Sequence, residues 1–210
     1  MSSRRLACAF YSLQCMHTLF PIAPNYPEGF KYIPEFLTTQ EEKRLVDEIA
    51  NTTLHTFMFQ GFEAKRRVAS FGYDYSFDKR SLSKGKDIPP TFFPLIRKVA
   101  SYLSLSSDVF AELLLTEYPV GSVINWHRDA PPFDIIAGIS LNADCVLRLR
   151  PQEKAKHGRT SIISIPVQRR SLYIIQGLAR SEWQHSIAPV KDIRYSITLR
   201  TLKTELEGIS

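Results

Sequence analysis

Two histidines and an aspartate in the second half of the chain have side chains that bind metals. His127 and Asp129 are one residue apart, so in an extended segment both side chains lie on the same face and can reach one ion. His185 is a third candidate ligand if the fold brings it opposite this pair. Two His and one carboxylate hold Fe(II) on one face and leave positions open for a chelating co-substrate and dioxygen. By itself a His-x-Asp pair is weak evidence, because such pairs are more often surface or hydrogen-bonded pairs.

A segment near the C-terminus carries two arginines on one strand face. Residues 194–200 read RYSITLR and alternate, so Arg194, Ser196, Thr198 and Arg200 lie on the same side. Arginines that face a protein interior are costly unless anions neutralise them. A bound dicarboxylate and a metal-binding carboxylate would supply those anions, because the planar guanidinium binds carboxylates in bidentate fashion. The alternative is an edge strand whose arginines are solvated.

The elements that must position these groups are mainly strands. One helix is expected to open at the capping-box sequence Thr39-Gln40-Glu41-Glu42, and a second from Thr91 to Leu103. The segment Arg66–Phe77 predicts a strand or hairpin. Further strands are predicted at Tyr32–Leu37, Leu113–Tyr118, Ile135–Leu141, Cys145–Leu149, Thr160–Pro166, Ser171–Gln176 and Tyr195–Thr201. This pattern predicts an α+β, mainly β fold, closed or with two antiparallel sheets, and helices packed outside.

The composition is that of one globular domain of 210 residues. Residues 1–28 are expected to be an N-terminal extension, and residues 29–210 the domain. The 27 Lys and Arg residues exceed the 21 Asp and Glu residues, and the resulting charge of +6 is consistent with a polyanionic partner. No apolar run reaches the roughly 18 residues of a membrane span. Three widely spaced cysteines support neither a disulfide framework nor a Cys-rich zinc site. We expect a monomer in the cytoplasm, with a nuclear or organellar location left open.

The order and context of these motifs resemble one family. The segment EYPVGSVINWH, residues 117–127, is similar to the strand and Tyr-x-x-Gly turn that lead into the first iron ligand of AlkB-type Fe(II)/2-oxoglutarate dioxygenases. Residues 177–187, GLARSEWQHSI, resemble the approach to that family's second histidine ligand. Residues 66–75, RRVASFGYDY, are similar to the hairpin that covers the substrate base. The resemblance spans roughly residues 29–202.

This resemblance implies a double-stranded β-helix (jelly-roll) core with N-terminal helices outside and a substrate-lid hairpin. It implies that His127, Asp129 and His185 bind Fe(II). Arg194 would pair with the distal carboxylate of the co-substrate 2-oxoglutarate, and Tyr118 would donate a hydrogen bond to the same group. Arg200 would lie near the other end of 2-oxoglutarate and near Asp129. Two further positions near the co-substrate, where repair members often carry Asn, are Thr116 and Ser196.

Six residues are candidate contacts to the substrate. They are the aromatic residues Phe71, Tyr73, Tyr75 and Trp126, for stacking or pocket formation, and Arg66 and Arg67, for phosphate contact. Phe71, Tyr73, Tyr75 and Phe77 are expected to share one strand face. The alternatives are core packing for the aromatic residues and a solvated charged turn for the arginines.

The function implied by the resemblance is oxidative demethylation of N-alkylated bases in DNA or RNA. The reaction consumes O2 and 2-oxoglutarate and releases succinate, CO2 and an aldehyde. A second hypothesis keeps the oxygenase chemistry but places it on a protein side chain or a modified tRNA nucleoside. A third is a non-catalytic basic β-protein that binds nucleic acid. Residues 130–132 are Ala-Pro-Pro and lack the acidic residue that some members place against the base, so substrate identity stays open.

Overall fold

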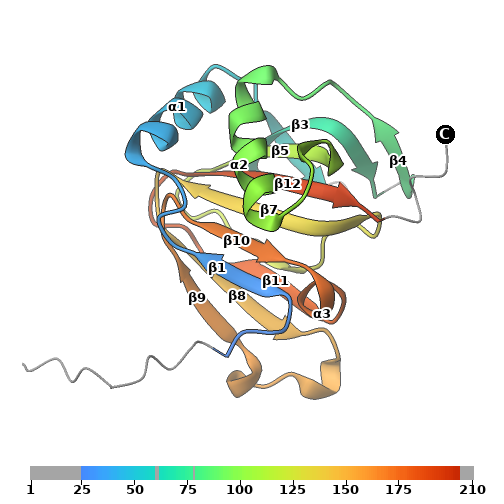
Figure 1. The fold of residues 1–210 in the computed structure, drawn as a ribbon. Helices are drawn as coiled ribbons and strands as arrows, with labels where there is room; N and C mark the ends of the chain where they lie inside the picture. The colour runs from blue at the N-terminus through green and yellow to red at the C-terminus, as the bar shows by residue number, and fades with distance from the viewer. Residues whose placement is uncertain (1–24, 60–61, 78, 204–210) are drawn as a thin grey trace, which may run out of the picture.

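The computed structural model describes residues 25–59, 62–77 and 79–203, so nearly all of the predicted N-terminal extension lies outside the described residues. Figure 1 shows two sheets lying one above the other, with two helices over the upper one. In chain order the elements are β1 Phe30–Ile33, α1 Thr39–Ala50, β2 His55–Phe59, β3 Phe62–Ser76, β4 Ser81–Lys84, α2 Phe93–Leu103, β5 Phe110–Tyr118, β6 Ile124–His127, β7 Phe133–Leu141, β8 Cys145–Pro151, β9 Ile163–Val167, β10 Leu172–Ile175, α3 Gly177–Ser181, β11 Trp183–Ile187 and β12 Arg194–Leu202.

The larger sheet has eight strands in the order β1-β10-β7-β12-β5-β3-β2, with β4 paired to β3, and the smaller has the order β6-β11-β8-β9. The strand pairs in both sheets are antiparallel. The predicted mainly β architecture with two antiparallel sheets is confirmed. The candidate ligands His127 and His185 lie on the small sheet, and both arginines of the alternating segment lie on β12 of the large one.

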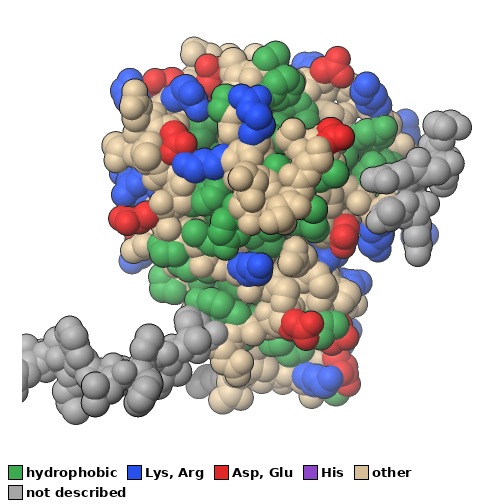
Figure 2. All heavy atoms as spheres, viewed as in Figure 1, with side chains coloured by type: hydrophobic (Ala, Val, Ile, Leu, Met, Phe, Trp, Pro, Cys, Tyr) green, Lys and Arg blue, Asp and Glu red, His purple; other side chains and the backbone are tan. Residues whose placement is uncertain are grey.

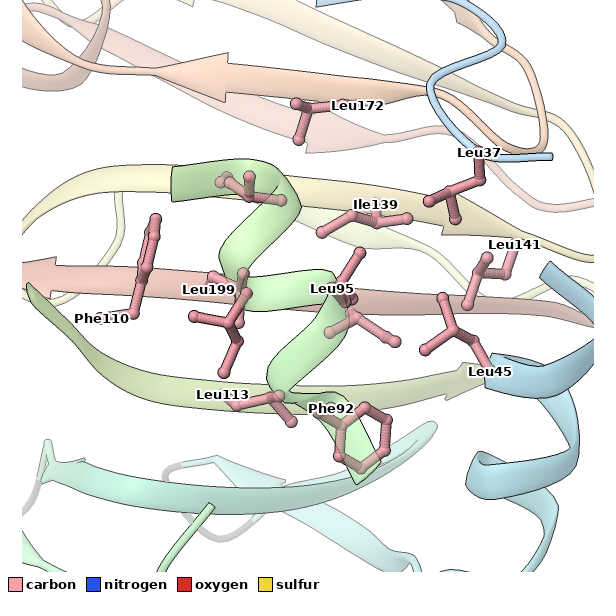
Figure 3. Packing of buried hydrophobic residues seen from close by; sticks show 14 of the residues in the cluster. Leu37, Leu45, Phe92, Leu95, Phe110, Leu113, Ile139, Leu141, Leu172 and Leu199 are labelled. Carbon is pink, nitrogen blue, oxygen red and sulfur yellow. The ribbon is translucent and has the colours of Figure 1, made fainter. Parts of the chain in front are cut away.

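Two hydrophobic cores fill the spaces on either side of the large sheet. One lies under α1 and α2, where Leu95 of α2 packs over Leu113, Ile139 and Leu199 of the sheet (Figure 3). The other lies between the two sheets and includes Leu147 of β8. The side chains of β12 alternate between the two cores. Ile197 and Leu199 belong to the helix-side core, and the residues on either side of them in the strand face the small sheet. The prediction that the helices pack outside the sheet is confirmed.

The N-terminal elements differ from the prediction by a few residues. β1 ends at Ile33 rather than at Leu37, because Glu35 adopts a left-handed conformation with φ of 50° in the turn that follows. The capping box begins at Thr38, one residue before the predicted Thr39. The Thr38 hydroxyl accepts a hydrogen bond from the Glu41 N–H at 3.2 Å, and Glu41 accepts one from the Thr38 N–H at 2.7 Å. Glu42 is therefore left free to turn inward.

Other predicted boundaries differ from the observed ones by a few residues, and several short elements were not predicted. β9 begins at Ile163 rather than Thr160, because residues 159–161 form a 3₁₀ turn. α2 begins at Phe93 after a 3₁₀ turn that starts at Pro90. The strands β2, β4, β6 and β11 and the short helix α3 were not predicted as elements; each has only four or five residues, too few to show a clear period.

The surface over the helices carries no concentrated charge. On the face shown in Figure 2, basic and acidic side chains are interspersed. The excess of basic residues in the sequence is therefore not gathered on this face. Among the helices that the structure describes, none is long and apolar enough to cross a membrane.

Candidate active site

The two candidate histidines meet across the small sheet. His127 ends β6, and His185 lies in the middle of β11 directly opposite it in the antiparallel ladder. Their ring centres are 4.2 Å apart. The sequence left the position of His185 conditional on the fold, and the strand pairing brings it beside His127.

Asp129 has one occupied and one free carboxylate oxygen. Its Oδ1 accepts hydrogen bonds from Nε of Arg200 at 3.0 Å and from Nη2 at 2.7 Å. Its Oδ2 is buried and has no hydrogen-bond partner among the described residues. This oxygen lies 3.4 Å from Nε2 of His185, outside hydrogen-bonding geometry. Two ligands of one metal at about 2.1 Å and at right angles lie roughly 3 Å apart, so this separation is close to that of two metal-binding atoms.

The three side chains are neighbours without forming a finished metal cage. Within the described ranges, no group of three or more His, Cys, Asp or Glu side chains could hold an ion as it stands. Nδ1 of His127 lies 2.9 Å from the backbone oxygen of Asn125. If Nδ1 donates to that oxygen, the other ring nitrogen of a neutral imidazole carries the free lone pair. His127 would then offer Nε2 to a metal.

The charge states of these groups are those that a metal requires. Burial, helped by the neighbouring His127, lowers the pKa of His185 to about 3. Burial also lowers the pKa of His127, against the opposing effect of Asp129. Burial alone would raise the pKa of Asp129, but Arg200 and both histidines hold it below its usual range. Near pH 7 the site therefore presents two neutral imidazoles and a carboxylate.

Arg200 is clamped between two carboxylates. Its Nη1 donates to Oε2 of Glu112 at 2.5 Å, while its other nitrogens hold Asp129. Glu112 faces Arg200 across the β5–β12 ladder, and Ser70 donates a hydrogen bond of 3.3 Å to its other oxygen. The sequence assigned no role to Glu112. A charged residue in the otherwise apolar run FAELLL was the available signal, but its partner depends on strand register.

Arg180 connects the two segments that carry the ligands. It belongs to α3, which leads into β11, and its Nη2 donates to the backbone oxygens of Asp129, Ala130 and Phe133 at 3.1, 2.8 and 3.0 Å. Sequence reasoning gave this residue no role beyond its place in a motif. Its contacts fix the backbone that follows His127 relative to the strand that carries His185.

Arg194 is a buried cation with free donors. Its exposed fraction is 0%, and its Nε donates to Oγ of Ser140 at 2.9 Å. Neither Nη1 nor Nη2 has a hydrogen-bond partner in the part of the chain that the structure describes. Such a group requires an anion, and two adjacent N–H groups on a planar guanidinium match a carboxylate.

The predicted co-substrate residues line up beside Arg194. Tyr118 lies opposite Arg194 across the β5–β12 ladder, and the next pair on the same face is Thr116 with Ser196. All four are buried. Ser196 Oγ is 3.5 Å from the Tyr118 hydroxyl. The ladder then continues to the Glu112–Arg200 pair, so this strand face runs from the free guanidinium to the carboxylate of Asp129.

Two adjoining cavities open beside His127. The smaller, about 350 Å³, is lined by His127, Asp129, Arg200 and Tyr75 among others. The larger, about 560 Å³, is lined by His127 and Trp126 with several basic and apolar side chains. Arg66 lines both cavities, and its guanidinium carbon lies 4.0 Å from the centre of the Phe57 ring.

The remaining substrate candidates do not all face these cavities. Phe71 packs against the helix-side core, and Tyr73 lines a separate hollow beside α2, whereas Tyr75 packs against the core between the sheets. The prediction that these aromatic residues share one strand face is therefore wrong. Phe71 and Tyr73 lie on the helix side, and the change of face falls between Tyr73 and Tyr75. Arg67 points outward and forms a bidentate ion pair with Glu117 at 2.7 Å.

Sequence comparison places the chain in a known class. The profile of the 2OG-Fe(II) oxygenase superfamily matches residues 29–202. The chain therefore belongs to the 2-oxoglutarate- and Fe(II)-dependent oxygenase superfamily, whose members use Fe(II), 2-oxoglutarate and O2. It is a 2-oxoglutarate-dependent dioxygenase.

Curated relatives make the chain AlkB-like within this superfamily. It is 26% identical over 176 residues to the tRNA (carboxymethyluridine(34)-5-O)-methyltransferase alkbh8 of Xenopus tropicalis, a match covering 81% of this chain and 27% of that protein. It is 26% identical to the alkylated DNA repair protein ALKBH8 homolog of Arabidopsis thaliana, covering 85% and 59%. The human alpha-ketoglutarate-dependent dioxygenase alkB homolog 3 is 24% identical, covering 57% and 46%. The chain thus spans only part of the length of these relatives.

Solved structures share the fold. OsALKBH1 superposes with a TM-score of 0.64 at 12% identity, covering 82% of this chain and 96% of that one. A prolyl hydroxylase of Trichoplax adhaerens, in complex with a hypoxia inducible factor peptide, gives a TM-score of 0.61 at 17% identity, covering 87% of each chain. Identities this low show the fold alone. They confirm the predicted jelly-roll architecture; the lid role of the β2–β3 hairpin stays a prediction.

Proposed function

We propose that this dioxygenase oxidatively demethylates N-alkylated nucleic-acid bases, with iron bound by His127, Asp129 and His185. The observation that carries the substrate assignment is the larger cavity, which begins at His127 and combines aromatic side chains with Lys65 and Arg66. Aromatic faces stack on bases, and basic groups neutralise phosphates. A duplex base must flip out to enter such a cavity, whereas a single-stranded base enters directly.

The donor set fits an iron centre. Asp129 keeps Oδ2 free because Arg200 occupies only Oδ1, and the two neutral imidazoles lie beside it. Two imidazole nitrogens and one carboxylate oxygen are the donor set of Fe(II) oxygenases. Closed zinc sites use sulfur-rich donor sets instead. When bound, the iron would supply the oxidation with O2 and 2-oxoglutarate. The co-substrate is converted to succinate and CO2, and the alkyl group leaves as an aldehyde.

The protein groups position the co-substrate and the metal. Arg194 binds the distal carboxylate of 2-oxoglutarate through Nη1 and Nη2, with the Tyr118 hydroxyl nearby. Thr116 and Ser196 line the path between this anchor and the metal. Arg200 orients Asp129 through the hydrogen bonds to its Oδ1. These roles give partners to Oδ2 of Asp129 and to Nη1 and Nη2 of Arg194, which have none among the described residues.

The test is turnover with Fe(II), 2-oxoglutarate and O2 against methylated single-stranded DNA and RNA. We expect succinate formation stimulated by a methylated strand, and a product lighter by one methylene unit. Succinate formation that no methylated strand stimulates, by a protein shown to hold iron and 2-oxoglutarate, would refute the substrate assignment while leaving the oxygenase chemistry intact.

A second candidate keeps the chemistry and changes the substrate to a modified tRNA nucleoside. It is favoured by the relatives named tRNA (carboxymethyluridine(34)-5-O)-methyltransferase. The chain covers only about a quarter of these proteins, so their named activity does not transfer to it. Product mass separates the two candidates, because stable hydroxylation adds an oxygen whereas demethylation removes a methyl group. A protein side chain, the other alternative, has only a fold neighbour in its favour.

A further inference from the structure

The outer face of the small sheet carries an aromatic ring with two arginines on it. On β8, Leu147 and Leu149 are buried in the core between the sheets, so the alternating Arg148 and Arg150 point to the opposite, outer side. The guanidinium carbons of these arginines lie 5.2 and 4.4 Å from the centre of the Trp126 ring. Two guanidinium groups thus lie against the same indole ring, on the face of the small sheet that points away from the core.

Both guanidinium groups are held in place. Nε of Arg148 donates to Oγ of Ser186 at 3.0 Å, and Nε of Arg150 donates to Oε1 of Gln184 at 2.8 Å. Neither arginine takes part in any of the ion pairs found among the described residues. A guanidinium that stacks on an aromatic face through its plane keeps its edge N–H groups free for an anion. The pair is therefore oriented and lacks a countercharge.

This face continues into the larger cavity. Trp126, which carries the two guanidinium groups, also lines the cavity that begins at His127. Lys65 and Arg128 line the same cavity, and Glu63 is the one acidic side chain among its described lining residues. A positively charged surface thus leads from β8 along Trp126 to the candidate iron site.

We propose that this outer face binds the phosphates of a single-stranded nucleic acid on one side of the target base. Planar, pre-oriented guanidinium groups match phosphate oxygens, and a single strand can leave its base in the cavity while its backbone follows the sheet. The inference rests on the proposed nucleic-acid substrate and extends it by naming the surface that holds the flanking strand. A strand held there would reach His127 without crossing the helix-covered face.

The experiment measures binding of a short, unmodified, fluorescein-labelled single-stranded RNA by fluorescence anisotropy at several salt concentrations. Substituting Arg148→Gln with Arg150→Gln is expected to weaken binding about ten-fold. It should also reduce the slope of log affinity against log salt by about 1.4, since each phosphate contact to a single strand contributes about 0.7. The matched control is Lys154→Gln with Lys156→Gln, which removes the same charge from an exposed turn after β8 and should leave the slope nearly unchanged.

A second variant guards against misfolding of the double substitution. Val146 is 38% exposed on the same strand face as Arg148, so Val146→Glu places a carboxylate beside the arginines without disturbing the core. It should weaken binding by a similar factor. Unchanged affinity and slope in folded arginine variants, or displacement of the RNA by polyglutamate of equal charge, would overturn the inference alone. Failure of the wild-type protein to bind any strand would overturn the nucleic-acid substrate with it.

Discussion

Arg194 and Tyr118 lie opposite each other in the ladder between β12 and β5, with the guanidinium carbon 4.9 Å from the centre of the phenol ring. The ring covers one face of a cation that is fully buried and whose terminal nitrogens have no partner among the described residues. Cation–π contact offsets only part of the cost of burying a charge. The arrangement is therefore that of a binding site for an anion.

We predict that Arg194→Met abolishes tight binding of 2-oxoglutarate. Methionine keeps much of the side-chain volume but removes a bidentate charged contact, so affinity should fall by about 100-fold, or roughly 3 kcal/mol. Anaerobic calorimetric titration of the iron-loaded protein with 2-oxoglutarate measures this change. Arg67→Met is the control, because Arg67 is bound to Glu117 on the outside of the same sheet. Equal loss in both variants would contradict the assignment.

A second prediction concerns the clamp on Arg200. Glu112→Gln removes the charge that holds Nη1 of Arg200 and so loosens the guanidinium that orients Asp129. Iron affinity should fall by about ten-fold, the lower end of the effects seen for groups that orient metal ligands. Competition with a coloured chelator measures it. Glu117→Gln, on the same strand with an outward-facing partner, should leave iron affinity as in the wild type; if both variants behave alike, Glu112 has only a structural role.

Glu42 gives a prediction about pH and stability. It is 2% exposed, accepts hydrogen bonds from Arg169 at 2.7 and 3.1 Å, and accepts the Asn142 N–H at 2.9 Å. Burial alone would raise the pKa of Glu42, but the bonds from Arg169 and Asn142 hold it below its usual value of 4.5. Because the folded-state pKa is lowered, this stabilisation is fully present above pH 4.5 and is lost as pH falls through the folded value.

The corresponding test compares the wild type with Glu42→Gln in urea. At pH 7 the variant should be less stable by about 1–3 kcal/mol, and the difference should shrink steadily below pH 4.5. Asp47→Asn, which removes one partner of an exposed i,i+4 pair with Lys43, should cost less than about 0.5 kcal/mol. A stability difference that stays constant down to pH 3.5 would show that Glu42 acts through its shape rather than its charge.

The features that could be predicted from the sequence are local to one strand or helix. The features that were missed depend on the pairing of strands that are distant in sequence. The alternation around Arg194 is a period-2 pattern within one strand, and it correctly placed both arginines on one face, which the structure turns toward the small sheet. Glu112 escaped notice because only the β5–β12 register identifies its partner. Period 2 also put Tyr75 on the face of Phe71 and Tyr73, but Tyr75 packs against the core between the sheets, a change of face that strand periodicity does not signal.

The capping box shows how a one-residue error changes a residue's role. Thr38 and Thr39 are both suitable N-cap residues, and each is followed three positions later by a glutamate. With Thr38 as the cap, Glu41 closes the box and Glu42 becomes the buried partner of Arg169. The inward position of Glu42 depends on its contacts with Asn142, after β7, and with Arg169, after β9, which are distant in sequence.

The central claim is that His127, Asp129 and His185 bind one iron. The direct measurement is iron content per chain after anaerobic loading with Fe(II) and removal of free metal, for the wild type, His185→Ala and His157→Ala. His157 is exposed and bonded to the backbone of Pro151 at 2.9 Å, away from the site. We predict about one iron per chain in the wild type and in His157→Ala, and almost none in His185→Ala. Iron retained at the wild-type level by a folded His185→Ala variant would contradict the claim.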